Sequence, residues 1–156
     1  MTTLISLDGL FVTRLNIDWR QPTTQSVDIS SLNVSCDYDV AFNANDNSKF
    51  KMDLRLKFSE VGKQQTDVGY IIEADMVGLF SFPQEIDIQT RHALVRVNGV
   101  SILYSSLRGI LATVSGLFPA GKFTLPSISP QDLVKQVEEL KGKQASCINA
   151  NGKKKE

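Results

Sequence analysis

The amino-acid sequence predicts an α+β domain whose first half forms an antiparallel sheet and whose second half is helical. Two observations lead to this prediction. Apolar and polar residues alternate with period two in four runs before Pro83, as in strands with one buried and one exposed face. After Pro83 the apolar residues recur every three or four positions, which is the spacing of a helix. Burial on one face favours antiparallel pairing, and 156 residues fit a single domain.

The four predicted strands cover residues 5–19, 32–43, 50–58 and 68–82. The connector 43–48 is rich in Asn, Asp and Ser, so it predicts a hairpin between the second and third strands. The fourth strand alternates less strictly, because Ile71, Val77 and Leu79 make its second face apolar as well. Such a strand is either central and covered on both sides, or its second face meets another subunit or a client.

Two helices are predicted after the strands. The first follows an apolar stripe from Val100 to Leu117, whereas residues 86–97 fit either a helical start or an irregular crossover. The second begins with Ser129 as its N-cap and Pro130 at its first position. Residues 1–140 are therefore expected to form the single domain, and 141–156 a disordered polar tail.

Composition and motifs exclude several classes of function. Seventeen basic and seventeen acidic residues leave no net charge, so nucleic acid is not an expected partner. No apolar run approaches the ~18 residues of a membrane-spanning helix, and the N-terminus lacks the pattern of a secretory signal. His92 is the single histidine, Cys36 and Cys147 lie far apart, and no catalytic motif is present. We therefore expect a cytoplasmic domain that is not an enzyme and needs neither cofactor nor metal.

The most informative segment is the loop 118–130 between the two helices. It carries Phe118, Phe123, Leu125 and Ile128, although loops cross the surface and are usually polar. The loop either packs on the domain's own sheet and closes its core, or forms the wall of an apolar groove that receives extended polypeptide. The residues alone favour the first arrangement.

Three segments in this order resemble the SecB family of protein-export chaperones: Glu73–Phe80, Asn98–Arg108 and Leu117–Ile128. The order of strands and helices also agrees, and the likeness runs from about Asp8 to Leu140. The resemblance implies a four-stranded antiparallel sheet with two helices packed on one face, assembled as a dimer of dimers. It also implies a protein without catalysis that holds unfolded chains in apolar surface grooves.

The resemblance further implies the residues of two binding surfaces. The client groove would be lined by the loop, the first helix and the second strand, at Val40, Phe42, Tyr104, Leu107, Phe118, Phe123, Leu125 and Ile128. Ile71 and Glu73 would contact the translocation ATPase SecA. Asn16 and Arg20 stand where the family has acids, so holding clients is a firmer expectation than docking on this motor. A groove role predicts that Phe123→Ala with Leu125→Ala weakens client binding and changes stability little.

The leading hypothesis is an ATP-independent SecB-like chaperone that keeps unfolded precursor proteins competent for export and works as a cytoplasmic homotetramer. One alternative is a SecB-like chaperone that guards an antitoxin in a toxin–antitoxin system. The other is an oligomeric interaction module without chaperone activity. Neither nucleic-acid binding nor membrane insertion belongs to any of these hypotheses.

Overall fold

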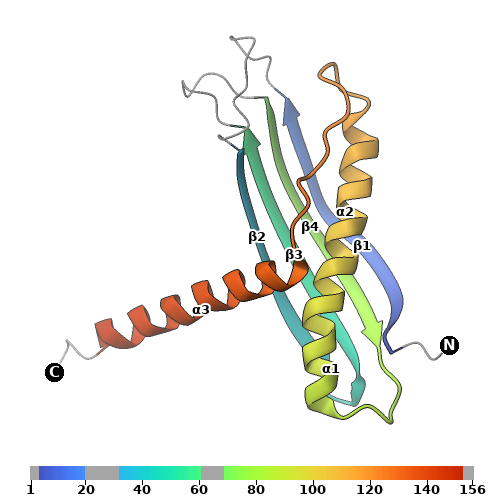
Figure 1. Ribbon diagram of the computed structural model, residues 1–156, viewed down its shortest axis with the longest axis vertical. Helices are drawn as coiled ribbons and strands as arrows, with labels where there is room; N and C mark the ends of the chain where they lie inside the picture. Colours follow the sequence, from blue (N-terminus) through green and yellow to red (C-terminus); the bar gives the residue numbers. More distant parts are fainter. Residues whose placement is uncertain (1–3, 20–31, 61–68, 153–156) are drawn as a thin grey trace.

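The computed structural model describes residues 4–19, 32–60 and 69–152, and it places four strands before the helices (Figure 1). The strands are β1 (Ser6–Trp19), β2 (Leu32–Asn43), β3 (Asp46–Glu60) and β4 (Tyr70–Ser81). Neighbours pair antiparallel in the order β1-β4-β3-β2, so β1 and β2 are the two edges of the sheet. The predicted fold class, α+β with a four-stranded antiparallel sheet, is confirmed.

The four strands follow the sequence prediction, and their boundaries differ from it by a few residues. The predicted hairpin joins β2 and β3, and its turn is tight because Asn43 pairs with Asp46. As a result β3 begins at Asp46, four residues before Phe50, the residue at which the alternation starts in the sequence. Val68 and Arg20 lie outside the described residues.

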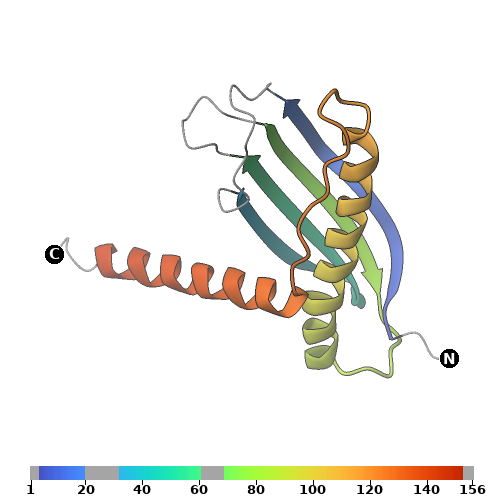
Figure 2. The same ribbon diagram turned by 45° about the horizontal axis from the view of Figure 1, so that its top comes forward.

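The helices also begin and end differently from the prediction. A continuous helix consists of α1 (Ile88–Leu94), a π-helical turn η2 (Val95–Gly99) and α2 (Val100–Ser115). Its start is fixed by Asp87, whose side chain accepts a hydrogen bond from the Thr90 backbone N–H at 3.0 Å. The second helix, α3 (Pro130–Gly152), continues past Leu140, where the disordered tail was expected to begin. No proline after Pro130 interrupts it, and it extends away from the sheet beyond the β2 edge (Figures 1 and 2).

The core lies between the helices and the face of the sheet that they cover, which we call the inner face. On β4 the inner-face residues are buried while the alternate ones are half-buried or exposed, as the pleat of a strand requires. α2 packs against β3 and β4, the two central strands. The fully buried side chains include Met52, Leu54, Leu56, Phe58, Ile72, Met76, Phe80, Leu103, Leu107 and Leu111.

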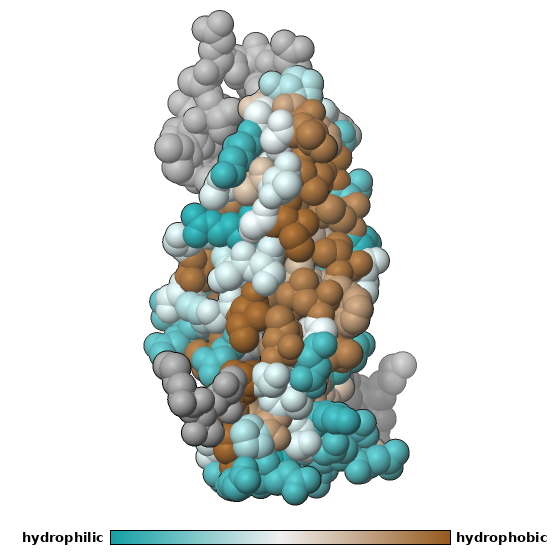
Figure 3. Space-filling view, turned by 90° about the vertical axis from the view of Figure 1, so that its right-hand side faces the viewer, coloured by the Kyte–Doolittle hydropathy of each residue, from teal (hydrophilic) through white to brown (hydrophobic). Residues whose placement is uncertain are grey.

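Strand β1 keeps apolar side chains in solvent on both faces. Its register with β4 shifts twice, between Leu7 and Gly9 and between Val12 and Arg14. The pairing with β4 consequently turns Leu7, Val12 and Leu15 to the inner face and Phe11 to the outer face. All four remain exposed. Figure 3 shows the result as a continuous apolar band on the side of the molecule where α2 and β1 lie.

By length and composition, the helix Ile88–Ser115 is apolar enough to cross a membrane. Arg96, Asn98 and the adjacent Ser105 and Ser106 are among the polar residues that interrupt it, so the sequence shows no unbroken apolar run. The buried face of the same helix packs on the sheet, and a third of its most apolar stretch is buried there.

The close approach of α2 to β4 gives a first prediction. A methyl group at Gly78 would lie 2.8 Å from Cδ2 of Leu103 and 2.7 Å from the Phe80 ring. We expect Gly78→Ala to lower the free energy of unfolding by about 1–3 kcal/mol, because the core has no room for it. Gly109, where an added methyl group would meet nothing within 4 Å, is the control. There Ala should raise stability by up to about 1 kcal/mol, since it favours the helix. Urea unfolding that ranks the two variants equally would contradict this packing.

Candidate functional site

The loop after α2 packs on the inner face of the sheet. The Phe123 ring lies 4.5 Å from that of Phe58 and 5.5 Å from that of Tyr70, between centroids, and Leu125 is fully buried. The Phe123 N–H donates to Ser115 Oγ at 2.7 Å. The loop backbone is held at two more points. The Tyr70 hydroxyl donates to the Gly121 carbonyl at 2.6 Å, and the Tyr104 hydroxyl to the Pro126 carbonyl at 2.8 Å. Of the two arrangements open in the sequence, the loop therefore adopts the one that closes the core.

The eight residues predicted to bind clients differ in exposure. Four are buried in the core, three are half-buried and one is exposed. The buried ones are Tyr104, Leu107, Phe123 and Leu125; the half-buried ones are Val40, Phe118 and Ile128; the exposed one is Phe42. Their role in client binding remains a prediction, and in this conformation the buried four are not accessible to a client.

Apart from Leu107, Phe123 and Leu125 in the core, these residues lie in three separate places. Tyr104 and Ile128 line a hollow of about 230 Å³ between α2 and the loop, beside Arg108, whose guanidinium donates to Ser127 Oγ at 3.0 Å. Phe118 lies near the end of α2, with its ring 6.1 Å from that of Tyr70. Val40 and Phe42 lie on the inner face of β2, away from both.

Helix α3 crosses the inner face of β2 at Tyr38. The buried side chains of Leu133, Val134 and Val137 belong to the part of α3 that covers the sheet. The Tyr38 hydroxyl donates to Glu138 at 3.3 Å, and burial followed by the charge of Glu138 raises the pKa of Tyr38 to about 12. Two apolar stretches of β2 are therefore left partly uncovered, one on each side of this crossing.

The first stretch contains Val34 and Cys36, and the second contains Val40 and Phe42. Burial raises the pKa of the Cys36 thiol to about 12, so this side chain is a neutral, apolar one at physiological pH. At the second stretch the His92 ring packs edge-on to Phe42 and Phe50, at 6.0 and 5.2 Å between centroids. The sequence analysis gave His92 no role, and only its tertiary position reveals that it supports Phe42.

The opposite, outer face of the sheet carries paired charges. Glu73 forms ion pairs with Arg14 and with Lys57, the latter at 3.3 Å, and Arg14 also lies 3.7 Å from Asp75. Ile71 and Glu73, the predicted motor contacts, lie together in a hollow of about 340 Å³ on this face. Asn16 lies opposite Glu73 in the β1–β4 register and adds no charge there.

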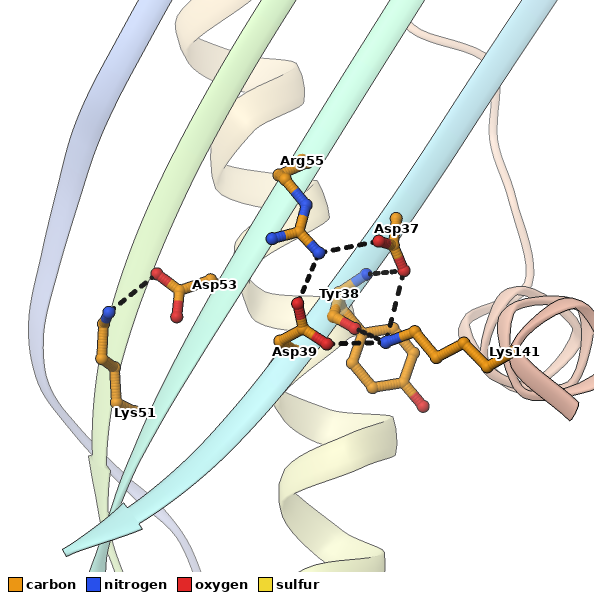
Figure 4. Close-up of polar contacts among 7 residues, drawn as sticks. All are labelled: Asp37, Tyr38, Asp39, Lys51, Asp53, Arg55 and Lys141. Carbon is orange, nitrogen blue, oxygen red and sulfur yellow. Dashed lines mark hydrogen bonds and ion pairs between the residues drawn. The ribbon is translucent and has the colours of Figure 1, made fainter. Parts of the chain in front are cut away.

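A second group of outer-face charges joins α3 to β2. Arg55 bonds to Asp37 at 2.7 Å and to Asp39 at 2.5 Å, and Lys141 of α3 lies 2.8 Å from Asp39 and 3.4 Å from Asp37 (Figure 4). Hydrogen bonds from Lys141 and Arg55 lower the pKa of Asp39. At Asp37 desolvation acts to raise the pKa, but Arg55 and Lys141 outweigh it, so the pKa of Asp37 is lowered as well. Both carboxylates are thus held ionised.

Among the residues that the structure describes, no group of three or more His, Cys, Asp or Glu is placed to hold a metal ion.

Comparison with known proteins finds similarity in structure only. No protein-family model matches the chain, and no curated protein sequence matches it. A SecB-like chaperone of Mycobacterium tuberculosis (Rv1957), solved in complex with a ChAD peptide from the HigA1 antitoxin, aligns with a TM-score of 0.58. The alignment covers 80% of this chain and 91% of that one at 14% identity. A protein of unknown function from Streptococcus agalactiae aligns with a TM-score of 0.44 and 12% identity, over 81% of this chain and 100% of that one. The first likeness shows that the fold is SecB-like.

The buried loop gives a second prediction, which revises the expectation that the loop can be altered at little cost. We expect Leu125→Ala to lower the free energy of unfolding by about 2–5 kcal/mol, because it leaves a cavity in the core. Leu117, which is 87% exposed, provides the control, and Leu117→Ala should change stability by less than about 0.5 kcal/mol. Equal urea midpoints for the two variants would mean that the loop does not close the core.

Proposed function

We propose that this chain is a molecular chaperone that holds unfolded polypeptide without using nucleotide. The SecB-like fold supports this proposal, and one observation carries it. Phe42 is 59% exposed on the inner face of β2, although strand residues that face the helices of an α+β domain are normally buried. Together with half-buried Val40, it offers an unfolded chain an apolar surface that the domain itself leaves uncovered.

For the client, we favour an antitoxin over exported precursors. The similar M. tuberculosis chaperone was solved with a peptide from an antitoxin, which makes an antitoxin segment the first candidate for this chain. The outer face argues in the same direction. Glu73 is paired with Arg14 and Lys57, and so presents little free negative charge to a translocation ATPase such as SecA. Export of precursors remains the second candidate, with a weak motor contact.

The proposal also places the protein in the cytoplasm, without catalytic activity and without a cofactor. Antitoxins and newly made precursors are both met in that compartment. Holding an unfolded chain requires no bond to be made or broken, since burial of apolar surface at about 25 cal/mol per Å² supplies the binding free energy.

We further propose that the working form is a homotetramer, a dimer of dimers. Leu7, Val12 and Leu15 of β1 are 38–41% exposed on the inner face, next to the apolar side of α2. Among the described strands β1 also lies at an edge of the sheet, and an edge strand favours association. A second copy that covers this edge and face would remove the apolar band of Figure 3 from water.

The holding function is tested by suppression of the aggregation of a chemically unfolded protein, in the absence of nucleotide. We expect Phe42→Ser to raise the chaperone concentration needed for half-suppression about tenfold, because each client contact there loses its apolar anchor. Leu140, which is also 59% exposed but lies on α3, is the matched control, and Leu140→Ser should behave as the parent. A parent protein that suppresses no aggregation would refute the chaperone proposal.

The assembly is tested by light scattering. We expect a mass near four times 17.2 kDa at micromolar concentration, and smaller species for Leu15→Lys, which places a charge on the apolar face. Asn16→Lys adds the same charge on the outer face, opposite Glu73, and should leave the mass unchanged. A parent protein that stays monomeric contradicts the tetramer.

A further inference from the structure

At Tyr38 of β2, the backbone N–H and carbonyl groups are both hydrogen-bonded to side chains. β2 ends the sheet, and within the described part of the chain no strand lies on its other side. The Tyr38 N–H donates to Asp37 Oδ1 at 2.8 Å, and the Tyr38 carbonyl accepts a hydrogen bond from Lys141 Nζ. In an antiparallel strand the N–H and C=O of one residue point to the same side. Both groups of Tyr38 therefore face the free edge, and side chains occupy them there.

The same alternation sets the direction of the neighbouring residues. Cys36 and Val40 lie two positions from Tyr38 and Phe42 lies four, so their N–H and C=O groups face the free edge as well. Among the described residues, no hydrogen bond joins these edge groups to another segment. The side chains of the three residues point to the inner face. An incoming strand would thus meet free backbone groups and apolar side chains at the same residues.

Helix α3 lies across this edge and is held there by contacts of Glu138 and Lys141 with β2. Glu138 is held by the Tyr38 hydroxyl at 3.3 Å and by Arg96 at 3.1 Å. One turn later Lys141 reaches back to the Tyr38 carbonyl and to Asp39, and its Nζ lies 5.2 Å from the centre of the Tyr38 ring (Figure 4). The crossing divides the edge into two short pieces. With α3 displaced, residues 34–42 would form one edge about 30 Å long.

We propose that the free edge of β2 binds an extended segment of polypeptide as a fifth strand, in competition with α3. This inference rests on the proposed chaperone function and specifies how the client is held. The segment carries apolar residues at alternate positions, which enter the inner face beside Val40 and Phe42. Basic residues lie between them. They take the place of Lys141 at Asp37 and Asp39, which retain only Arg55 once α3 moves.

A second copy of the chain fits this edge less well. Two β2 edges paired antiparallel around Tyr38 would bring Asp37 and Asp39 of both copies onto one face. Four carboxylates would then face two Arg55 side chains, and like charges opposite each other destabilise a strand pair. The charge of the edge therefore selects a basic segment.

Backbone pairing is tested with a fluorescein-labelled peptide of nine residues in which valine and lysine alternate, VKVKVKVKV. When the peptide pairs antiparallel to β2 with its valines facing inward, the valine N–H groups point to β2, whereas the lysine N–H groups point to solvent. N-methylation of the three central valines should weaken binding, measured by fluorescence anisotropy, by at least about tenfold, because it removes three backbone hydrogen bonds. N-methylation of the lysines should change it less than about twofold.

The competition between α3 and the peptide for the β2 edge is tested with the same unmethylated peptide. Lys141→Ala should tighten its binding about threefold to fivefold, as expected for the loss of an exposed competing ion pair. Lys135→Ala removes an exposed lysine from the same helix and should leave the affinity unchanged. Tightening by both variants or by neither would overturn the competition.

The remaining outcomes separate this inference from the proposed function. Equal binding of the two methylated peptides, with aggregation still suppressed by the parent, overturns backbone pairing and leaves the chaperone proposal intact. A protein that binds no peptide and suppresses no aggregation refutes both. A Lys141→Ala variant that doubles its mass in light scattering shows that a second copy takes the edge, and this too overturns the inference.

Discussion

One helix is too narrow to cover four strands, and much of the structure follows from this mismatch. A helix with its side chains is about 10 Å across, whereas four strands span roughly 14 Å between the axes of the outermost ones. α2 therefore covers β3 and β4 and leaves both edges of the inner face to other elements. On the β2 side the loop and α3 provide cover with Phe123, Leu125 and Val137. On the β1 side the cover is partial: Leu10, Ile17 and Trp19 are half-buried against the core, whereas Leu7, Val12 and Leu15 remain exposed.

The two edges of the sheet consequently have different properties. The β1 edge carries exposed apolar side chains on both faces. The β2 edge carries a charged cluster and a helix that closes its central backbone groups. Charged side chains and covering segments are common means of protecting an edge strand from uncontrolled pairing. In this chain the protection covers only the middle of β2. The parts of the edge around Cys36 and Phe42 therefore remain available for pairing with another strand.

The sequence predicted the elements better than their faces. Alternation of period two identified all four strands, because each has one face in water, and helical spacing identified α2 and α3. The face of β1 was not predictable, since two register shifts reverse the alternation and turn Phe11 outward and Val12 inward. Residues 86–97 gave no clear period because Arg91, which is buried, bonds to the carbonyls of Asn47 and Gln84 and takes an apolar position. At the candidate site the residues alone favoured a loop that closes the core, which is the arrangement of Phe123 and Leu125 in the structure, whereas the resemblance implied a groove wall. The contacts of Lys141 with Tyr38 join residues about a hundred positions apart, and no local pattern reports them.

The π-helical turn η2 determines how the two ends of the long helix are oriented about their common axis. A π turn holds one more residue than an α turn, and one residue corresponds to about 100° of rotation. This phase offset lets Arg91 of α1 face the β2–β3 hairpin while Leu103 and Leu107 of α2 face the centre of the sheet. Shortening residues 95–99 by one would restore a regular α-helix and rotate one end by more than a quarter turn. The helix could then keep either the contacts of Arg91 with the hairpin or those of Leu103 and Leu107 with the sheet, but not both. The length of this one turn therefore couples the two ends of the domain.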